Sequence, residues 1–76
     1  MENKYKMITT KLPNGGELHD YSNGIKHWLL NGKHHREDGP AIEWGDGEES
    51  WYLHGEYIPC TTQKQFEQLM RLKAFW

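Results

Sequence analysis

The sequence predicts an α+β fold that is mostly β: an antiparallel meander of about five to six short strands, packed by one C-terminal helix. Three observations lead to this prediction. They are a tandem repeat, a series of Gly-containing turn dipeptides, and a change to helical periodicity near the C-terminus. The 76 residues fit a single domain spanning residues 1–76.

Two segments of the chain repeat each other without a gap. Residues 19–32 align with residues 42–55 at a constant offset of 23 positions. Trp28 then corresponds to Trp51, and Leu30 corresponds to Leu53. Self-similarity at a fixed period indicates one structural unit used twice. We therefore divide the sheet into repeat units at residues 19–41 and 42–58.

Turn dipeptides bound segments of strand length. Asn23-Gly24, Asn31-Gly32 and Asp46-Gly47 favour type I′ hairpins, because both central residues of that turn need positive φ. His54-Gly55 is a weaker form of the same signal, and Asn14-Gly15-Gly16 predicts a turn upstream. Closely spaced turns of this kind indicate an antiparallel meander.

Period-two alternation assigns the two faces of the sheet. Trp28 and Leu30 share one face, as do Trp51 and Leu53, and this face is predicted to be the core. The opposite face is half-polar, which suits a solvated or ligand-bearing surface. It carries Ile25, His27, Leu29, Ser50 and Tyr52.

The C-terminal segment changes to helical periodicity over about residues 61–75. Thr61 or Thr62 can cap its first turn. The predicted helix lies across the Trp28/Trp51 face with an apolar stripe of Phe66, Leu69, Met70 and Lys73, widened by Leu72 and Trp76. Apolar residues beyond a single stripe predict a homodimer interface at Leu72, Phe75 and Trp76, although a frayed helix end explains them equally well.

Charge and cysteine content exclude several classes of protein. The net charge is -2 with both signs interspersed, which argues against a general nucleic-acid or anionic-membrane binder. We expect no signal peptide, because the N-terminal residues have no apolar stretch, and no membrane span. The single cysteine, Cys60, excludes a disulfide within the chain and fits a reducing, cytoplasmic setting.

One segment carries a distinctive motif, His35-Arg36-Glu37-Asp38-Gly39-Pro40-Ala41. It resembles the "HREDGPA" repeats of small proteins from tailed phages and prophages, which look like short β-hairpin repeats in the style of MORN units. The resemblance covers residues 19–58, but the second repeat lacks the charged run, so any site carried by the motif occurs once. It implies a phage origin, the cytoplasm of an infected or lysogenic bacterium, and a β-repeat fold.

The densest polar cluster is the charged linker, residues 33–38, and it is the predicted binding site: Lys33, His34, His35, Arg36, Glu37 and Asp38. Arg36 can pair with a phosphate or carboxylate, and Tyr52 and Tyr57 on the second face can stack on a base. In that reading, Arg36→Ala abolishes activity and barely changes stability. The alternative is structural: Arg36 pairs with Glu37 or Asp38, and Asp38 closes a turn onto Gly39.

No catalytic group, metal or cofactor is predicted. The five histidines have no metal-ligand spacing. Cys60 lies at a helix entry, where its pKa could fall, but we predict that it is a buried, inert cysteine. We therefore expect a non-enzymatic accessory protein that binds and inhibits a host factor, such as a host-defence protein. Two alternatives stay open: an oligomeric sponge for a nucleotide-type signal, and a structural or virion-associated repeat protein.

Overall fold

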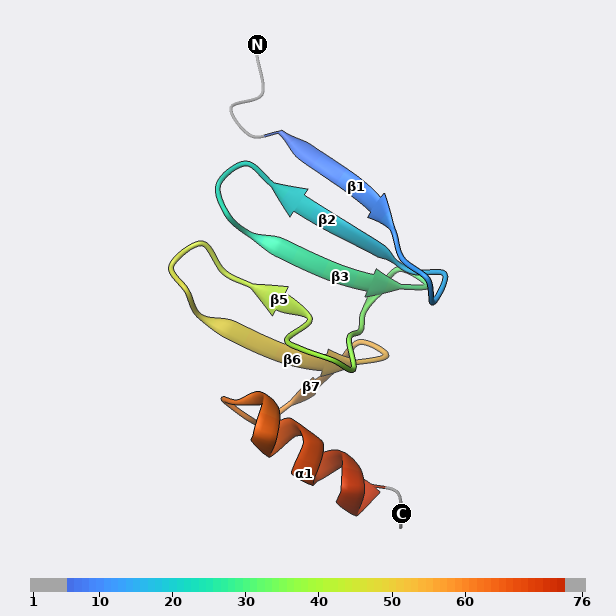
Figure 1. Ribbon diagram of the computed structural model, residues 1–76, viewed down its shortest axis with the longest axis vertical. Coiled ribbons are helices and arrows are strands. Elements are labelled where there is room, and N and C mark those ends of the chain that lie inside the picture. Colours follow the sequence, from blue (N-terminus) through green and yellow to red (C-terminus); the bar gives the residue numbers. More distant parts are fainter. Residues whose placement is uncertain (1–5, 74–76) are drawn as a thin grey trace.

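The computed structural model describes residues 6–73 and shows a mostly β, antiparallel α+β fold (Figure 1). The fold class predicted from the repeat and the turns is confirmed. The elements are β1 (Met7–Lys11), β2 (Glu17–Tyr21), β3 (Lys26–Leu30), β4 (Lys33–His34), β5 (Ile42–Glu43), β6 (Glu49–Leu53), β7 (Glu56–Ile58) and α1 (Gln63–Lys73).

The strands form one sheet in the order β1-β2-β3-β5-β6-β7, with β4 as a further partner of β3. Two short strands share one edge of β3. Its first half pairs with β5, where His27 lies opposite Ile42, and its second half pairs with β4, where Leu29 lies opposite His34. The chain leaves the sheet between these two strands. The start of the charged linker is therefore the strand β4, which the sequence did not predict.

Three turns share one three-residue geometry. Asn14-Gly15, Asn23-Gly24 and Asp46-Gly47 each place only the glycine at positive φ, and each Asn or Asp side-chain oxygen accepts a bond from the N–H two residues on. This is a type I turn followed by a left-handed residue. The prediction of type I′ turns at residues 23–24 and 46–47 is therefore wrong, because the Asx bond holds the first residue at negative φ.

Two turns have the predicted type I′ signature. Asn31 and His54 adopt φ of 54° and 49°, and the glycine after each is also positive. Both central positions of these two-residue hairpins are thus left-handed, as the type requires. The two repeat units match here in geometry as well as in sequence.

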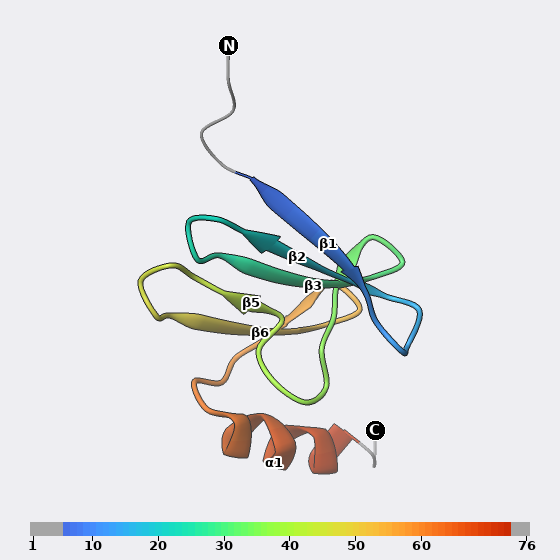
Figure 2. The ribbon, with the colours of Figure 1, turned by 45° about the horizontal axis from the view of Figure 1, so that its top comes forward.

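The core lies between α1 and the end of the sheet formed by β6 and β7. Trp51, Ile58, Cys60 and Phe66 are buried together, and three partly buried side chains pack against them: Leu53, Leu69 and Met70. Figure 2 shows α1 as a separate layer beneath this end of the sheet. The predicted apolar stripe of the helix is confirmed for Phe66, Leu69 and Met70.

The helix begins where Thr62 caps it. The hydroxyl of Thr62 accepts a bond from Gln65 N–H at 3.1 Å, and the Gln65 side chain accepts from Thr61 N–H at 2.8 Å. The first bond satisfies an N–H group that the first turn leaves without a partner, and the second ties the first turn to the residue before the cap. The helix is described to Lys73, so the predicted interface residues Phe75 and Trp76 lie outside the described residues. Within the described part of the chain, no helix has the length and apolar character to cross a membrane.

One prediction about the core is wrong. The helix covers Trp51 but does not extend over Trp28, because it packs only at the β6–β7 end. Trp28 is instead covered by Arg36, whose guanidinium carbon lies 3.9 Å from the centre of the indole ring. The second layer of the protein therefore has two parts, the linker after β4 and the helix. We call the side of the sheet that carries Trp28 and Trp51 the covered face.

Candidate functional site

The predicted site residues separate onto the two faces of the sheet. His35 and Arg36 fold over the covered face, whereas His34 and Tyr52 lie on the opposite face, where their rings are 5.3 Å apart. Strand alternation causes the division, because adjacent residues at the end of β4 point to opposite sides. Tyr57 lies beside Tyr52, and Lys33 is exposed.

Arg36 is held from several directions. Its Nε donates to Asp38 at 2.9 Å, and its Nη1 donates to the carbonyl of Pro40 at 3.2 Å and to Glu43 at 3.4 Å. The indole of Trp28 lies on one side of the guanidinium. A Cβ at Gly39 would come within 2.6 Å of the guanidinium carbon, so only glycine leaves room for it. The guanidinium is thus held by its own motif together with Trp28 and Glu43.

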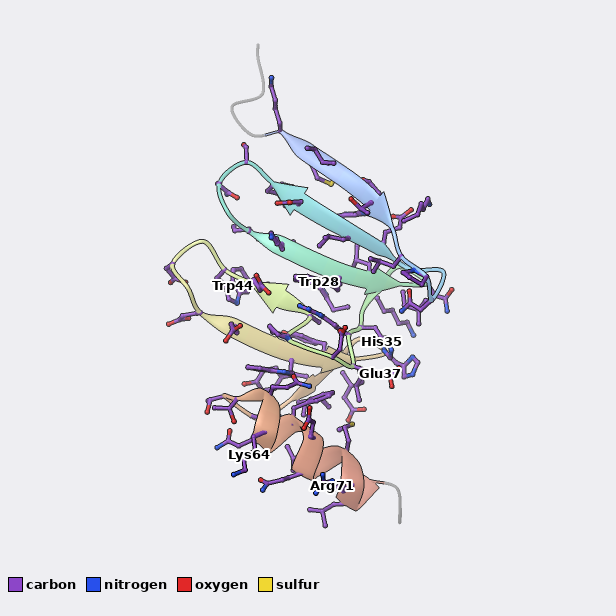
Figure 3. All side chains as sticks on the ribbon, in the orientation of Figure 1. Trp28, His35, Glu37, Trp44, Lys64 and Arg71 are labelled. Carbon is purple, nitrogen blue, oxygen red and sulfur yellow. The ribbon has the colours of Figure 1, made fainter. Side chains whose placement is uncertain are left out.

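The remaining motif residues also contact the fold. His35 is buried, and its Nδ1 accepts a bond from His54 N–H at 3.0 Å, which leaves Nε2 to donate to Glu37 at 3.3 Å. Ala41 is fully buried, and its carbonyl accepts from Trp28 N–H at 2.8 Å. Figure 3 shows Trp28, His35 and Glu37 gathered where the linker passes from β3 toward α1. The motif therefore builds the second layer over Trp28.

A depression of about 270 Å³ lies beside this motif. Its walls are the turn Leu12-Pro13-Asn14, Trp28 and the linker residues 35–38. The cation in its wall is Arg36, which is already paired with carboxylates. An anion entering the depression would have to compete with Asp38 and Glu43 for the same guanidinium.

The opposite side of the sheet carries a continuous strip of aromatic rings. We call it the aromatic–histidine face, and it consists of His19, Tyr21, His27, His34, Trp44, Tyr52 and Tyr57. Ring centres along the strip are 5.1 to 6.3 Å apart: Tyr21–His27, Trp44–His27, His27–His34, His34–Tyr52 and Tyr52–Tyr57. His19 lies directly opposite His27 in the register of β2 and β3. The strip joins five strands and the start of the turn after β5.

Both repeat units contribute to this strip in the same way. Tyr21 and Trp44, which correspond in the repeat, each place a ring edge-on to His27, at 5.7 and 6.3 Å. The sequence assigned His27 and Tyr52 to a half-polar face but did not connect them with the other rings. The connection depends on β2 and β4 being neighbours of β3, which period-two alternation alone does not specify.

The histidines at the centre of the strip share a hydrogen bond. Nδ1 of His27 and Nε2 of His34 are 2.8 Å apart. Partial burial lowers the pKa of both side chains, and the pKa of His27 is lowered further by the neighbouring His34 and His19. The centre of the face is thus favoured in its uncharged form near neutral pH.

Three of the five ring contacts along the strip are edge-to-face. Tyr57 meets Tyr52 at 67°, Tyr21 meets His27 at 78°, and Trp44 meets His27 at 75°. These are edge-to-face arrangements, which occupy ring faces within the strip. Neither α1 nor the linker, as far as the chain is described, lies over this side of the sheet, and Trp44 and Tyr57 remain 39% and 56% exposed.

Other chemistry finds little support among residues 6–73. No group of three or more His, Cys, Asp or Glu side chains is placed there to hold a metal ion. Cys60 is buried at the base of α1, and burial raises the pKa of its thiol. This burial agrees with the prediction of a buried, inert cysteine and not with its alternative, a pKa lowered at the helix entry.

Fold and surface together define a small open-sheet β-repeat protein with one face covered by a linker and a helix, and with an aromatic–histidine strip on the other. Comparison of the chain with protein-family models, with curated proteins and with solved structures found no match.

Proposed function

We propose that this chain is a non-enzymatic binding protein that attaches to another protein through its aromatic–histidine face. The observation that carries the proposal is the continuous strip from Trp44 to Tyr57 on a side of the sheet that no described element covers. Tyrosine and tryptophan are enriched at protein interfaces, where they bury large areas at low entropic cost, while charged residues are depleted at interface centres.

The charge on this face supports a protein partner over a nucleotide. The strip consists of aromatic and imidazole rings, and the cation beside it, Lys11, is already paired with Glu17. Nucleotide sites need donors for phosphate, which Arg and Lys usually supply. A sponge that uses His34, His35 and Arg36 together receives less support, because His34 lies on the opposite side of the sheet from the other two.

The partner's identity follows from the resemblance to phage repeat proteins and remains part of the proposal. In an infected bacterial cytoplasm, a small protein with an uncovered aromatic face would act by occupying a surface of a host protein. We propose a host-defence protein as that target, with inhibition as the result. A purely structural role is the remaining alternative, since the linker motif serves the fold.

The test compares the two sides of the molecule. Four immobilised proteins are incubated with a bacterial lysate: the wild type, Tyr57→Glu, Trp44→Glu and the control Leu72→Glu. The bound proteins are then quantified by mass spectrometry. Leu72 is a matched control because it is also an exposed apolar residue, 58% accessible, but lies on α1. We expect one host protein to be retained by the wild type and by Leu72→Glu, and lost by both face variants.

The candidate partner is then purified for a binding and inhibition assay. The face variants should weaken its affinity at least about tenfold, because each replaces an exposed aromatic ring of the interface with a charge, and should reduce inhibition to match. A partner that is retained by both face variants but lost by Leu72→Glu would move the interface to the helix and refute the proposal.

A further inference from the structure

The two edges of the sheet differ in how they are protected. At one edge, β7 has only three residues, is followed by Pro59, and lies next to the core packed by α1. At the other edge, β1 has five residues, all exposed, with Ile8 67% accessible. Figure 1 shows β1 at the end of the sheet farthest from α1. Protein edges are usually blunted by shortness, charged side chains, proline, bulges or cover, and of these β1, as described, has only the lysine at its end, Lys11.

The backbone groups of β1 divide between the sheet and the outside. Ser22 N–H donates to the carbonyl of Lys6 at 2.8 Å, and Leu12 N–H donates to the carbonyl of Gly16 at 3.0 Å. These bonds mark Lys6 and Leu12 as residues whose backbone points toward β2. Because the direction alternates along an antiparallel strand, the backbone groups of Met7, Thr9 and Lys11 point away from the sheet.

We infer that β1 is a docking edge for a second copy of this chain, with the two β1 strands antiparallel about a two-fold axis at Thr9. The three outward residues are spaced symmetrically about Thr9, so each copy offers donors and acceptors that match those of the other. Thr9 then faces Thr9 of the second copy, and Met7 faces Lys11 of the second copy. Six backbone hydrogen bonds result, one donated by each of the three outward residues of each copy.

The side chains suit this register. The Thr9 pair is a favourable cross-strand pair, and Ile8 lies opposite Thr10 of the second copy, so β-branched side chains meet on both faces. The lysines at positions 6 and 11 stand near the ends of the paired segment, where no lysine faces another lysine. A shift of the two-fold axis to Met7 or Lys11 would leave outward groups of β1 without partners among the β1 residues of the second copy.

The pairing has a geometric consequence for the aromatic–histidine face. Residues directly opposite each other in a sheet point to the same side. The two copies would therefore present their strips on one side of a continuous sheet, with the helices at its far ends. This inference does not depend on the proposed function, because the edge contact is formed by β1 and not by the strip.

Charge substitutions at Thr9 test the contact and its register. The measurement is the sedimentation and native mass of wild type, Thr9→Lys, Thr9→Glu and their equimolar mixture, with Thr9→Val as the control that keeps the outward N–H. We expect the wild type and Thr9→Val to dimerise. Each charged variant alone should raise the dissociation constant of the dimer severalfold. In the equimolar mixture, Thr9→Lys and Thr9→Glu should pair with each other and form a mixed dimer. Thr9→Pro should also weaken the dimer, since it removes an outward donor that β2 does not use.

Circular dichroism and melting temperature confirm that the variants fold, which is expected because the Thr9 side chain is exposed. A wild type that stays monomeric at all concentrations overturns the inference. A second result would also overturn it: a dimer that is unchanged in Thr9→Lys and Thr9→Pro but dissociates in Leu72→Glu. Such a dimer would be held together by α1. A wild type that dimerises but retains no host protein from the lysate would refute the proposed function alone.

Discussion

The guanidinium of Arg36 lies over the indole of Trp28, with its central carbon 3.9 Å from the ring centre. This pair takes the place that the helix was expected to fill above Trp28. The cation–π contact is accompanied by ion pairs with Asp38 and Glu43, which fix the guanidinium at 2.9 and 3.4 Å. Arg36 therefore contributes to stability through both charge and packing.

Arg36→Ala should destabilise the protein by about 2 kcal/mol, because it removes the cation–π contact and several charged hydrogen bonds and uncovers Trp28. This reverses the expectation that the substitution leaves stability unchanged. Urea unfolding followed by tryptophan fluorescence measures the effect. Arg36→Met keeps part of the packing and should lose less. If Arg36→Ala has the wild-type midpoint, the guanidinium is free for a ligand and the structural role is wrong.

Gly39→Ala should be destabilising by about 1–3 kcal/mol, as expected for overpacking in a tight site. The new methyl group would meet the guanidinium carbon of Arg36 at 2.6 Å, so the arginine must move off Trp28. The double variant Arg36→Ala/Gly39→Ala supplies the control. It should be little less stable than Arg36→Ala alone, whereas additive losses would show that the two residues do not interact.

Gln63 joins three parts of the covered face. Its Oε1 accepts from Trp51 Nε1 at 2.8 Å, and its Nε2 donates to the carbonyl of Glu37 at 3.3 Å. Gln63→Ala leaves the indole N–H of a buried tryptophan without its acceptor and should cost about 1–3 kcal/mol in the free energy of unfolding. Gln63→Glu keeps an acceptor for Trp51 and should retain most of the stability. Equal melting temperatures for Gln63→Ala and wild type would contradict this role.

Stability should also decrease in mild acid because of His27 and His34. Both have folded-state pKa values below the ordinary 6.5, chiefly through burial. As pH falls below about 6.5, the unfolded chain takes up protons before the folded chain does, so the free energy of unfolding decreases until the folded pKa values are passed. The groups that face this pair are His19, Tyr21, Trp44 and Tyr52.

Urea unfolding between about pH 7.5 and 5 measures this decrease. The double variant His27→Gln/His34→Gln should reduce the pH dependence, and each single variant should reduce it in part. A double variant that loses stability with pH as steeply as the wild type would show that other groups cause the decrease.

The sequence was sufficient for the fold class because the repeat and the turn dipeptides act locally. Asn31-Gly32 and His54-Gly55 specify their turns through φ alone, and the helical stripe at Phe66 is a local period. The cover over Trp28 was not predictable in this way. It depends on the contact between Arg36 and Trp28, which lies eight positions earlier on β3. The pattern of charges in a sequence does not indicate which aromatic ring an arginine side chain will contact.

The aromatic–histidine face was predicted only in part for a similar reason. Tyr52 and Tyr57 were recognised as a pair on the second face, and they do lie together, with ring centres 5.5 Å apart. Their link to His27 passes through His34, which lies on a strand of two residues. So short a strand has no periodicity of its own, and His34 was therefore grouped with its neighbours in sequence.

Trp28 and Trp51 are equivalent in the repeat but are covered by different segments, Trp28 by the linker and Trp51 by α1. The linker thus covers the tryptophan of an internal repeat unit, whereas the helix covers the tryptophan of the last unit in the described sheet. Such an architecture can be lengthened in whole units: each inserted 23-residue unit would bring its own HREDGPA segment to cover its own tryptophan, while a single helix would still close the array. In this chain the charged motif occurs once, and the second unit is followed by a helix in its place.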